Sequence, residues 1–227
     1  MSIISLLSDF GHKDPYVAEM KAVILSIAPQ ARIVDITHEI EKFNIRMGAY
    51  VLASAAPYFP PNTIHVAVVD PGVGTKRRPI IAETNRSLYV GPDNGLLMLA
   101  AHKEHIKKVY QLDNPKYMLS QVSKTFHGRD IFAPAAAHLA QGNKPSDFGP
   151  AIQDYILPEF AKPHAKKGEL LGEVLHIDDF GNIVSNISAE NLEKMGFHEG
   201  ITLLVRLGSK TLTLRFCSAY GLSLIHI

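Results

Sequence analysis

The sequence predicts an α/β fold, with an N-terminal layered α/β domain built on a mainly parallel sheet and a smaller β-rich C-terminal domain. Short apolar runs alternate with helical patterns over the first two-thirds of the 227 residues, which is typical of strands connected through helices. The stretch 156–167 is then rich in proline and lysine, and only short strand-like runs and one helical run follow it. We therefore expect an N-terminal domain over 1–155, a linker over 156–167 and a C-terminal β domain over 168–227.

The first strand is expected at 3–7, where IISLL is an unbroken apolar run. Pro15 is suited to start a helix, and apolar residues recur at helical spacing from there to Ile27. Residues 31–36, ARIVDI, are the next expected strand. This order of strand, helix and strand is the unit from which parallel sheets are built.

The second helix is expected from Ile45 to Ala56, where small and apolar residues share one face and Pro57 ends the pattern. Two further helices are expected, one over 94–102 and one from Asp130 to the helix-ending Gly142. The remaining strands of this domain are predicted from short apolar runs at 64–69, 79–83, 87–90 and 108–112.

Composition excludes several classes of function. The formal net charge of +1 gives no reason to expect a partner that is nucleic acid or a membrane surface. Cys217 is the only cysteine, so neither an internal disulfide nor a thiolate metal site is expected. The apolar run at 3–7 is too short for a secretory signal, and no segment approaches the length of a membrane span. A cytoplasmic protein is the expectation.

Polar clusters occur where ligands of such sheets bind, beyond the carboxyl ends of the strands. In the loop VVDPGVGTKRR, Asp70 opens a glycine-rich turn that Arg77 closes. A phosphate-binding loop would need lysine and a hydroxyl residue after its last glycine, and here a strand follows instead. Asp70 and Arg77 could form an ion pair that orients a water molecule, or they could simply pin the loop.

Asp9 in SDFG and His127 in TFHGRD each have a structural and a functional interpretation. Asp9 either caps the backbone of its own turn or contacts a ligand. A lone histidine near a helix start, such as His127, is more often structural. Asp9, Asp70 and His127 could together bind a metal, but no closely spaced ligand pair anchors such a site, so no metal is expected. Asp93, in GPDNG, is interpreted with its asparagine neighbour as a helix cap.

The segment HIDDFGNIVSNI places Asp178, Phe180 and Asn182 in one turn. An aromatic ring beside an amide is suited to a purine, because the ring stacks on the base and the amide bonds its edge. A plain β-turn nucleated by Asp179 and Gly181 explains the same residues.

Five motifs in this order, SDFG, VDPGVGTKRR, GPDNGLL, TFHGRDIFAPAAA and IDDFGN, make the chain resemble the S-adenosyl-L-methionine (SAM) hydroxide adenosyltransferases. These SAM hydrolases are related to the fluorinase and chlorinase enzymes. The resemblance covers residues 3–187. It implies an N-terminal α/β domain, a smaller C-terminal β domain, and a homotrimer with SAM bound between subunits. It implies the reaction of SAM with water to give adenosine and L-methionine, a nucleophilic substitution that needs no cofactor.

The resemblance also implies a catalytic set that handles the water molecule, and in this sequence it consists of Asp70, Arg77 and His127. The halogenating relatives carry a tyrosine in place of Asp70 and a hydroxyl residue in place of Gly128, so the sequence favours the water-using branch. The alternatives are a SAM-dependent halogenase-like enzyme and a protein that binds SAM or adenosine without turnover.

The implied substrate-binding residues are Asp9 for the ribose, Phe180 and Asn182 for the adenine, and Asp178 near the methionine. We also expect the C-terminal β domain to be incomplete. The final residues 222–227, LSLIHI, would be encoded by CTG TCT CTT ATA CAC ATC, a common adaptor sequence of DNA libraries, and we expect them to be artefactual.

Overall fold

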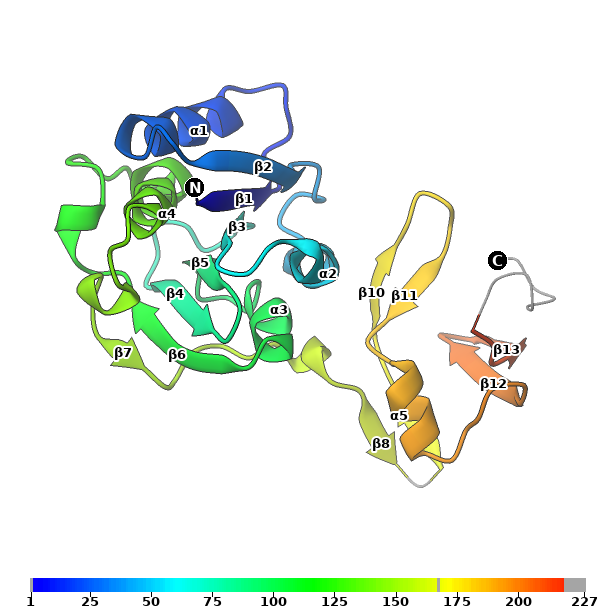
Figure 1. Cartoon of the computed structure of the whole chain (residues 1–227). Helices are drawn as coiled ribbons and strands as arrows, with labels where there is room; N and C mark the ends of the chain where they lie inside the picture. Colours follow the sequence, from blue (N-terminus) through cyan, green and yellow to red (C-terminus); the bar gives the residue numbers. More distant parts are fainter. Residues whose placement is uncertain (1, 167, 219–227) are drawn as a thin grey trace. The chain divides into compact units, whose positions relative to one another are not determined.

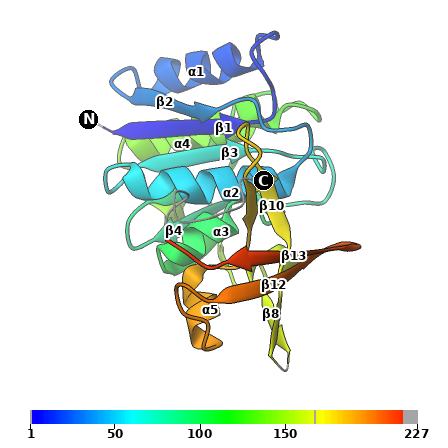
Figure 2. The ribbon, with the colours of Figure 1, turned by 90° about the vertical axis from the view of Figure 1, so that its right-hand side faces the viewer.

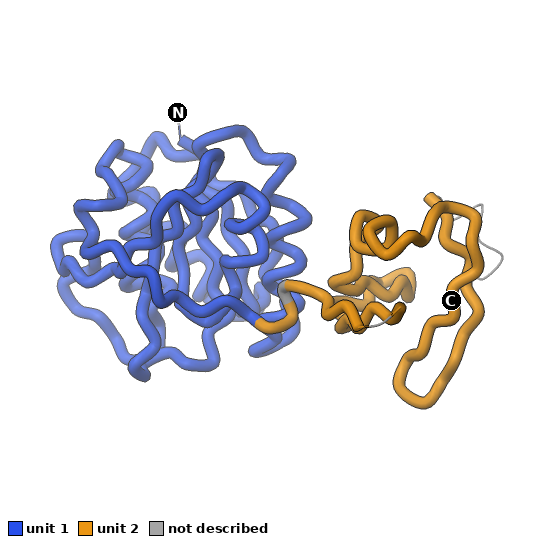
Figure 3. Tube along the Cα trace, turned by 90° about the horizontal axis from the view of Figure 1, so that it is seen from below, with its two compact units in different colours: residues 1–158 blue, residues 159–227 orange. Residues whose placement is uncertain are grey.

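A computed structural model describes residues 2–166 and 168–218, so the expectation for residues 222–227 lies outside the described part. The chain forms two compact units, Met1–Pro158 and Glu159–Ile227 (Figure 3). The expected linker over 156–167 thus contains the boundary between the units. It also contains a short 3₁₀ turn, Glu159–Ala161, and a strand, β8 (His164–Lys166).

The first unit contains one seven-stranded sheet, which is mainly parallel (Figure 1). Parallel pairing joins β2 to β1, β1 to β3 and β3 to β5, and antiparallel pairing joins β5, β4, β6 and β7 in turn. The α/β fold predicted from the sequence is confirmed. In their order across the sheet the strands are β2 (Arg32–Thr37), β1 (Ile3–Ser8), β3 (Ile64–Val68), β5 (Leu88–Pro92), β4 (Pro79–Thr84), β6 (Ile106–Gln111) and β7 (Ala151–Ile152).

Helices cover both faces of this sheet, and each face has its own apolar core (Figures 1 and 2). On one face, α1 (Tyr16–Ile27) and α4 (Ala133–Ala140) pack with buried side chains such as Ile24 and Phe132. On the other, α2 (Ile45–Ala55) and α3 (Met98–Lys103) enclose Leu52, Leu96 and their neighbours. No helix in the described part of the chain is both long and apolar enough to cross a membrane.

Local sequence explains where these helices begin and end. Asn44 caps α2 by accepting a hydrogen bond from the Met47 amide at 3.0 Å. The last predicted helix differs from the expectation, because residues Gly128–Phe132 form a π-helical turn before α4 begins. Such turns are rare and frequently occur at functional sites. Gly142, with φ +96°, ends the helix as predicted.

The second unit is rich in short antiparallel strands. Within its described residues, three two-stranded sheets pair β8 with β9 (Glu169–Leu171), β10 (Val174–Ile177) with β11 (Ile183–Ser185), and β12 (Thr202–Leu207) with β13 (Lys210–Arg215). One short helix, α5 (Ala189–Lys194), begins at Ser188, whose side chain and that of Asn191 cap each other's backbone amides.

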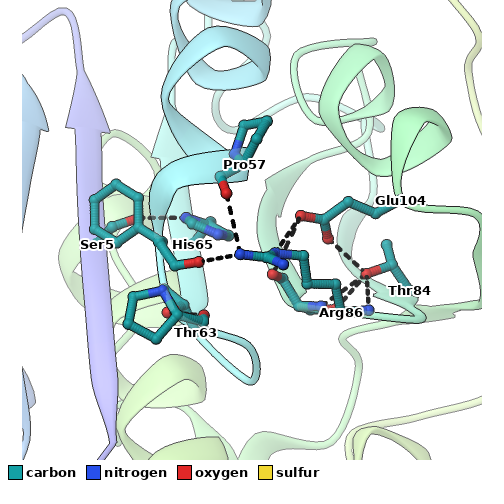
Figure 4. A network of polar contacts seen from close by, with 10 residues as sticks. Ser5, Pro57, Thr63, His65, Thr84, Arg86 and Glu104 are labelled. Atoms are coloured by element: carbon teal, nitrogen blue, oxygen red, sulfur yellow. Dashed lines mark hydrogen bonds and ion pairs between the residues drawn. The ribbon is translucent and has the colours of Figure 1, made fainter.

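A polar network, buried at Ser5 and His65 and partly exposed at Arg86, lies among the strands of the first unit and the loops beside them (Figure 4). The Ser5 hydroxyl is 2.6 Å from Nδ1 of His65, whose ring stacks on Tyr89 at 4.9 Å between ring centroids. Arg86 donates to the carbonyl oxygens of Pro57 and Phe59 at 3.0 and 2.6 Å. Burial and, to a smaller extent, the nearby Arg86 charge together lower the pKa of His65 to about 4, so this imidazole is neutral in the folded protein at neutral pH.

We predict that His65 makes stability depend on pH between about 6.5 and about 4. In the unfolded chain His65 takes up a proton below its ordinary pKa, while the folded protein resists protonation until about pH 4. The unfolded state therefore binds more protons across this window, and stability falls with falling pH by up to about 3 kcal/mol. Denaturant unfolding of the wild type and His65→Leu at several pH values measures this dependence of the free energy of unfolding on pH. His65→Leu should have the flatter profile, the exposed His105→Asn should match the wild type, and parallel profiles for the wild type and His65→Leu would contradict the prediction.

Candidate active site

The glycine-rich loop between β3 and β4 packs closely against a distant segment of the chain. Gly74 has φ +76°, and a Cβ atom at this position would lie 2.3 Å from the carbonyl oxygen of Lys124. Only glycine permits this approach. Since Lys124 lies three residues before His127, the contact holds the start of the π-helical turn against the loop that contains Asp70 and Arg77.

Asp70, Arg77 and His127 form one contiguous polar cluster. Nε of Arg77 is 2.9 Å from both carboxylate oxygens of Asp70, and Nη2 of Arg77 also donates to Oδ2. The same Nη2 is 2.8 Å from Nδ1 of His127. The side chains of Arg77 and Asp70 are only 8% and 6% exposed, and the guanidinium lies over the ring of Phe132. The ion pair that the sequence suggested is therefore present and nearly buried.

The contact with Arg77 determines where His127 carries its proton. A guanidinium can only donate, so Nδ1 of His127 accepts and the ring proton is on Nε2. Burial lowers the pKa of His127, and the positive charge of Arg77 lowers it further, although the carboxylates of Asp70 and Asp130 and a hydrogen bond with the Ser123 backbone oppose this. His127 is therefore a neutral imidazole with its ring proton on Nε2.

Arg77 has one further donor. Its Nη1 atom is buried, and in residues 2–166 and 168–218 it has no hydrogen-bond partner. A buried donor without an acceptor costs about 1–3 kcal/mol, and more when the group is charged. An oxygen atom of a ligand that reached Nη1 would recover this free energy, so the cluster is suited to bind one.

Asp9 lies at the same edge of the sheet as Asp70. Ser8 pairs with Val68 in the parallel register of β1 and β3, so both carboxylates follow the carboxyl ends of adjacent strands. Asp9 is buried, and its Oδ2 accepts the amide of Phe43 at 2.9 Å. Lys42 also donates to the carbonyl oxygen of Asp9. Asp9 therefore caps the backbone of a distant loop rather than that of its own turn.

Lys42 and Phe43 were not predicted from the sequence as part of this region. Phe43 adopts φ +63°, an uncommon conformation for a bulky residue, and its side chain is exposed. No local sequence pattern indicates these contacts, because they join positions 33 and 34 residues apart. The unusual conformation of Phe43 is visible only in the folded chain.

Asp178, Phe180 and Asn182 lie together in the second unit, in the turn between β10 and β11. Oδ1 of Asp178 accepts the amides of Phe180 and Asn182 at 3.0 and 2.8 Å, and the Asn182 amide group donates to Oδ2 at 2.8 Å. Gly181 has φ +85°, as such a turn requires. The turn leaves the Phe180 side chain 91% exposed.

The interpretation of Asp93 as a helix cap is wrong. Helix α3 begins after Leu97, and Asp93 instead accepts hydrogen bonds from Arg78, at 2.8 Å from Nη2, and from the amide of Ile156 at 2.8 Å. Arg78 also donates to Asp154 at 2.8 Å. The local sequence around Asp93 is typical of a capping carboxylate, but the groups that donate to Asp93 lie far away in the sequence. The local pattern does not indicate such distant donors, which explains the error.

Among the residues that the structure describes, no group of three or more histidine, cysteine, aspartate or glutamate side chains is arranged to hold a metal ion. Asp9, Asp70 and His127, the set weighed as a possible metal site, are instead held by other partners. Asp70 and His127 both contact Arg77, and Asp9 contacts the loop of Phe43.

Fold and site together define an enzyme with a two-unit α/β architecture and a buried Asp–Arg–His cluster beyond the carboxyl ends of its parallel strands. Residues 4–149 match the SAM hydroxide adenosyltransferase N-terminal domain, and residues 172–222 match the C-terminal domain of the same family. The chain belongs to the SAM hydroxide adenosyltransferase family.

Several relatives are similar to this chain over most of their length. A protein from Salinispora arenicola named (R)-S-adenosyl-L-methionine hydrolase is 42% identical, with 85% of this chain and 74% of the relative covered. A protein of the same name from Methanocaldococcus jannaschii is 40% identical, with 91% of this chain and 74% of the relative covered. A fluorinase from an Actinoplanes species is 29% identical, covering 86% and 74%. A crystal structure of an uncharacterized conserved protein from Thermotoga maritima superposes with a TM-score of 0.86 at 39% identity, covering 96% and 84%.

We predict that Arg77→Gln raises the pKa of His127. The substitution removes the nearby positive charge that opposes protonation and leaves the Asp70 carboxylate to favour it. Titration of the ring nitrogen resonances by NMR measures the change. Lys76→Gln is the matched control, because it removes one positive charge from an exposed neighbouring side chain, and it should leave the His127 pKa close to that of the wild type. An unchanged or lower His127 pKa in Arg77→Gln would contradict the assigned contact.

Proposed function

We propose that this protein hydrolyses SAM by in-line attack of a water molecule on C5′. The C5′–sulfur bond breaks as the C5′–oxygen bond forms, and SAM plus water gives adenosine, L-methionine and one proton. The observation that supports this best is the contact of Asp70, Arg77 and His127 in a chain 40–42% identical to relatives named (R)-SAM hydrolases. By the same comparison we propose the R configuration at sulfur for the substrate.

In this proposal Asp70 holds the attacking water. Arg77 donates one hydrogen bond to Oδ1 of Asp70 and two to Oδ2, so Oδ1 retains capacity to accept from a water molecule. As the new bond forms, positive charge develops on the water oxygen, and a neighbouring carboxylate stabilises this charge. In this proposal the Asp70 carboxylate also accepts the released proton. Fixing the water in line with the breaking bond lowers the entropic part of the barrier.

Arg77 and His127 act as donors in this proposal. The unpartnered Nη1 of Arg77 and the Nε2–H of His127 would donate to an oxygen atom of the reactants, and a donor fixed by its surroundings needs no reorganisation during the reaction. Methionine leaves as a neutral thioether, so sulfur needs no acid. We therefore propose a reaction without a cofactor or metal, in which a chelator leaves the rate unchanged.

We further propose that Asp9 binds the ribose hydroxyls, that Phe180 and Asn182 bind the adenine, and that Asp178 lies near the methionine. Asp9 follows the strand next to the one that precedes Asp70, which supports a single site at this edge. The exposed Phe180 side chain, presented by a well-bonded turn, is suited to stack on a base. We propose a homotrimer whose sites combine the first unit of one subunit with the second unit of its neighbour, and a cytoplasmic location.

Incubating the purified protein with SAM and separating the products by chromatography tests the reaction. Adenosine and methionine in equal amounts are the expected products. A 5′-halogenated nucleoside in the presence of halide would indicate the halogenase-like alternative, and bound but unchanged SAM would indicate a binding protein. A Cβ at Gly128 would lie 3.1 Å from Phe126 and 3.2 Å from the Met20 sulfur, so a hydroxyl residue at this position would require these side chains to shift.

We predict that His127→Ala lowers kcat by roughly a hundredfold or more, the scale of a positioned acid–base or donor group. The affinity for SAM should change little, because this group acts on the attacking water. Steady-state kinetics and calorimetric titration measure the two quantities. The exposed His105→Asn is the control, and kcat within a few-fold of wild type in His127→Ala would contradict the role of His127.

A mixing experiment tests the shared site. Asp70→Asn and Phe180→Ala should each be nearly inactive alone, since each damages a different half of the site. If neighbouring subunits supply the halves, joint refolding of equal amounts creates intact sites, about a quarter of the total in randomly mixed rings. Activity no greater than the average of the two variants would contradict a shared site, and light scattering checks the trimer.

A further inference from the structure

A serine, a histidine and an aspartate lie in series beside Asp9. The Ser8 hydroxyl, at the end of β1, is 2.7 Å from Nδ1 of His38. Nε2 of His38 is 3.2 Å from Oδ1 of Asp35, and Oδ2 of Asp35 is 2.5 Å from the Lys21 ammonium. Ser8 and His38 are fully buried, whereas Asp35 and Lys21 are partly exposed.

This series is not suited to nucleophilic catalysis. A serine nucleophile must present its oxygen to the substrate, but Ser8 has no exposed surface. Its oxygen is also occupied, since it accepts the amide of Phe10 at 3.3 Å besides its contact with His38. The buried series must therefore act through the neighbouring backbone.

The direction of the hydrogen bonds follows from the charges. Burial lowers the pKa of His38, which leaves the ring neutral, and the Asp35 carboxylate favours the proton on Nε2. Nδ1 of His38 then accepts the Ser8 hydroxyl proton, and the Ser8 oxygen accepts the Phe10 amide. The Ser8 oxygen thus links the His38 ring to the Phe10 amide, which fixes the backbone on both sides of Asp9.

The backbone around His38 holds Asp9 from the other side. The carbonyl oxygen of His38 accepts the amide of Gly11 at 2.7 Å, and five residues after His38 the amide of Phe43 donates to the Asp9 carboxylate at 2.9 Å. The segments 8–11 and 38–43 are thereby joined through the His38 ring, the His38 carbonyl and the Phe43 amide. A disturbance at His38 would reach the carboxylate through all of them.

We propose that Ser8, His38 and Asp35 are positioning residues that hold the Asp9 carboxylate for the ribose hydroxyls of the substrate. The inference rests on the proposed function, in which Asp9 binds the ribose. The three side chains contact no substrate themselves. They act through the backbone of residues 8–11 and through the loop that ends at Phe43.

Substitutions at both ends of the Ser8–His38 bond test this role. Ser8→Ala and His38→Leu should each raise the Kd for adenosine and the KM for SAM roughly tenfold, the scale of a small misplacement of a binding group. The value of kcat should change by less than about threefold, because binding to the ribose is the same in the ground and transition states. His38→Asn keeps an acceptor near the position of Nδ1 and should restore most of the affinity.

Strand β1 offers a matched control. Ser5 and His65 form the same kind of buried bond, 2.6 Å long, three residues earlier on the same strand. Ser5→Ala and His65→Leu remove an equivalent interaction and should destabilise the fold comparably, with KM and Kd unchanged. Asp9→Ala removes the carboxylate itself and therefore sets the upper limit for the rise of KM and Kd. Thermal unfolding of every variant separates lost stability from lost positioning.

The possible outcomes separate the two proposals. No adenosine from SAM with the wild type would overturn the proposed function, while adenosine titrations would still report on Asp9 and its supports. If the wild type turns over SAM but Ser8→Ala and His38→Leu leave KM and Kd unchanged, the positioning role alone is overturned. An equal rise of KM and Kd in Ser5→Ala and His65→Leu would also overturn the positioning role, because the effect would then be one of general stability.

Discussion

The Arg77 guanidinium is the group on which the candidate site depends. It is nearly buried, and a buried charge is tolerated only when it is paired and hydrogen-bonded. Arg77 meets this requirement with Asp70, seven residues earlier, and with His127, fifty residues later. The same contacts fix the protonation of His127 and leave Nη1 available for a ligand oxygen. Loop position, ring tautomer and ligand-binding capacity are therefore set by one side chain.

The parallel part of the sheet brings Asp9 to the same edge of the sheet as this cluster. Neighbouring strands β1 and β3 run in the same direction, so the chain leaves both at one edge. Asp9 follows the first strand and Asp70 the second. The glycine at position 74 then lets the loop of Asp70 reach the segment that leads to His127. Three segments remote in sequence thus meet without any long insertion.

Two buried serine–histidine pairs, whose serines both lie on strand β1, show how the same kind of interaction can have different roles at different positions. The Ser5–His65 pair lies beside the stacked Tyr89 ring and the Arg86 network, and we predict that it makes stability depend on pH. The Ser8–His38 pair lies where the strand ends and adjoins the backbone of Asp9. Equivalent chemistry supports the fold at one point and, in our proposal, a binding carboxylate at the other.

The sequence by itself determined the layered α/β fold and most strand and helix positions, because burial periodicity and proline or glycine boundaries are local properties. The resemblance of its motifs to the SAM hydroxide adenosyltransferases also indicated Asp70, Arg77 and His127 as members of one set. The tertiary structure alone decided that Asp93 pairs with Arg78, that Phe43 and Lys42 hold Asp9, and that a π-helical turn follows His127. These features arise from contacts between residues from 15 to 34 positions apart, or from the packing of a whole helix. A local pattern contains no information on which distant partner will satisfy a buried polar group, so only the folded chain could supply it.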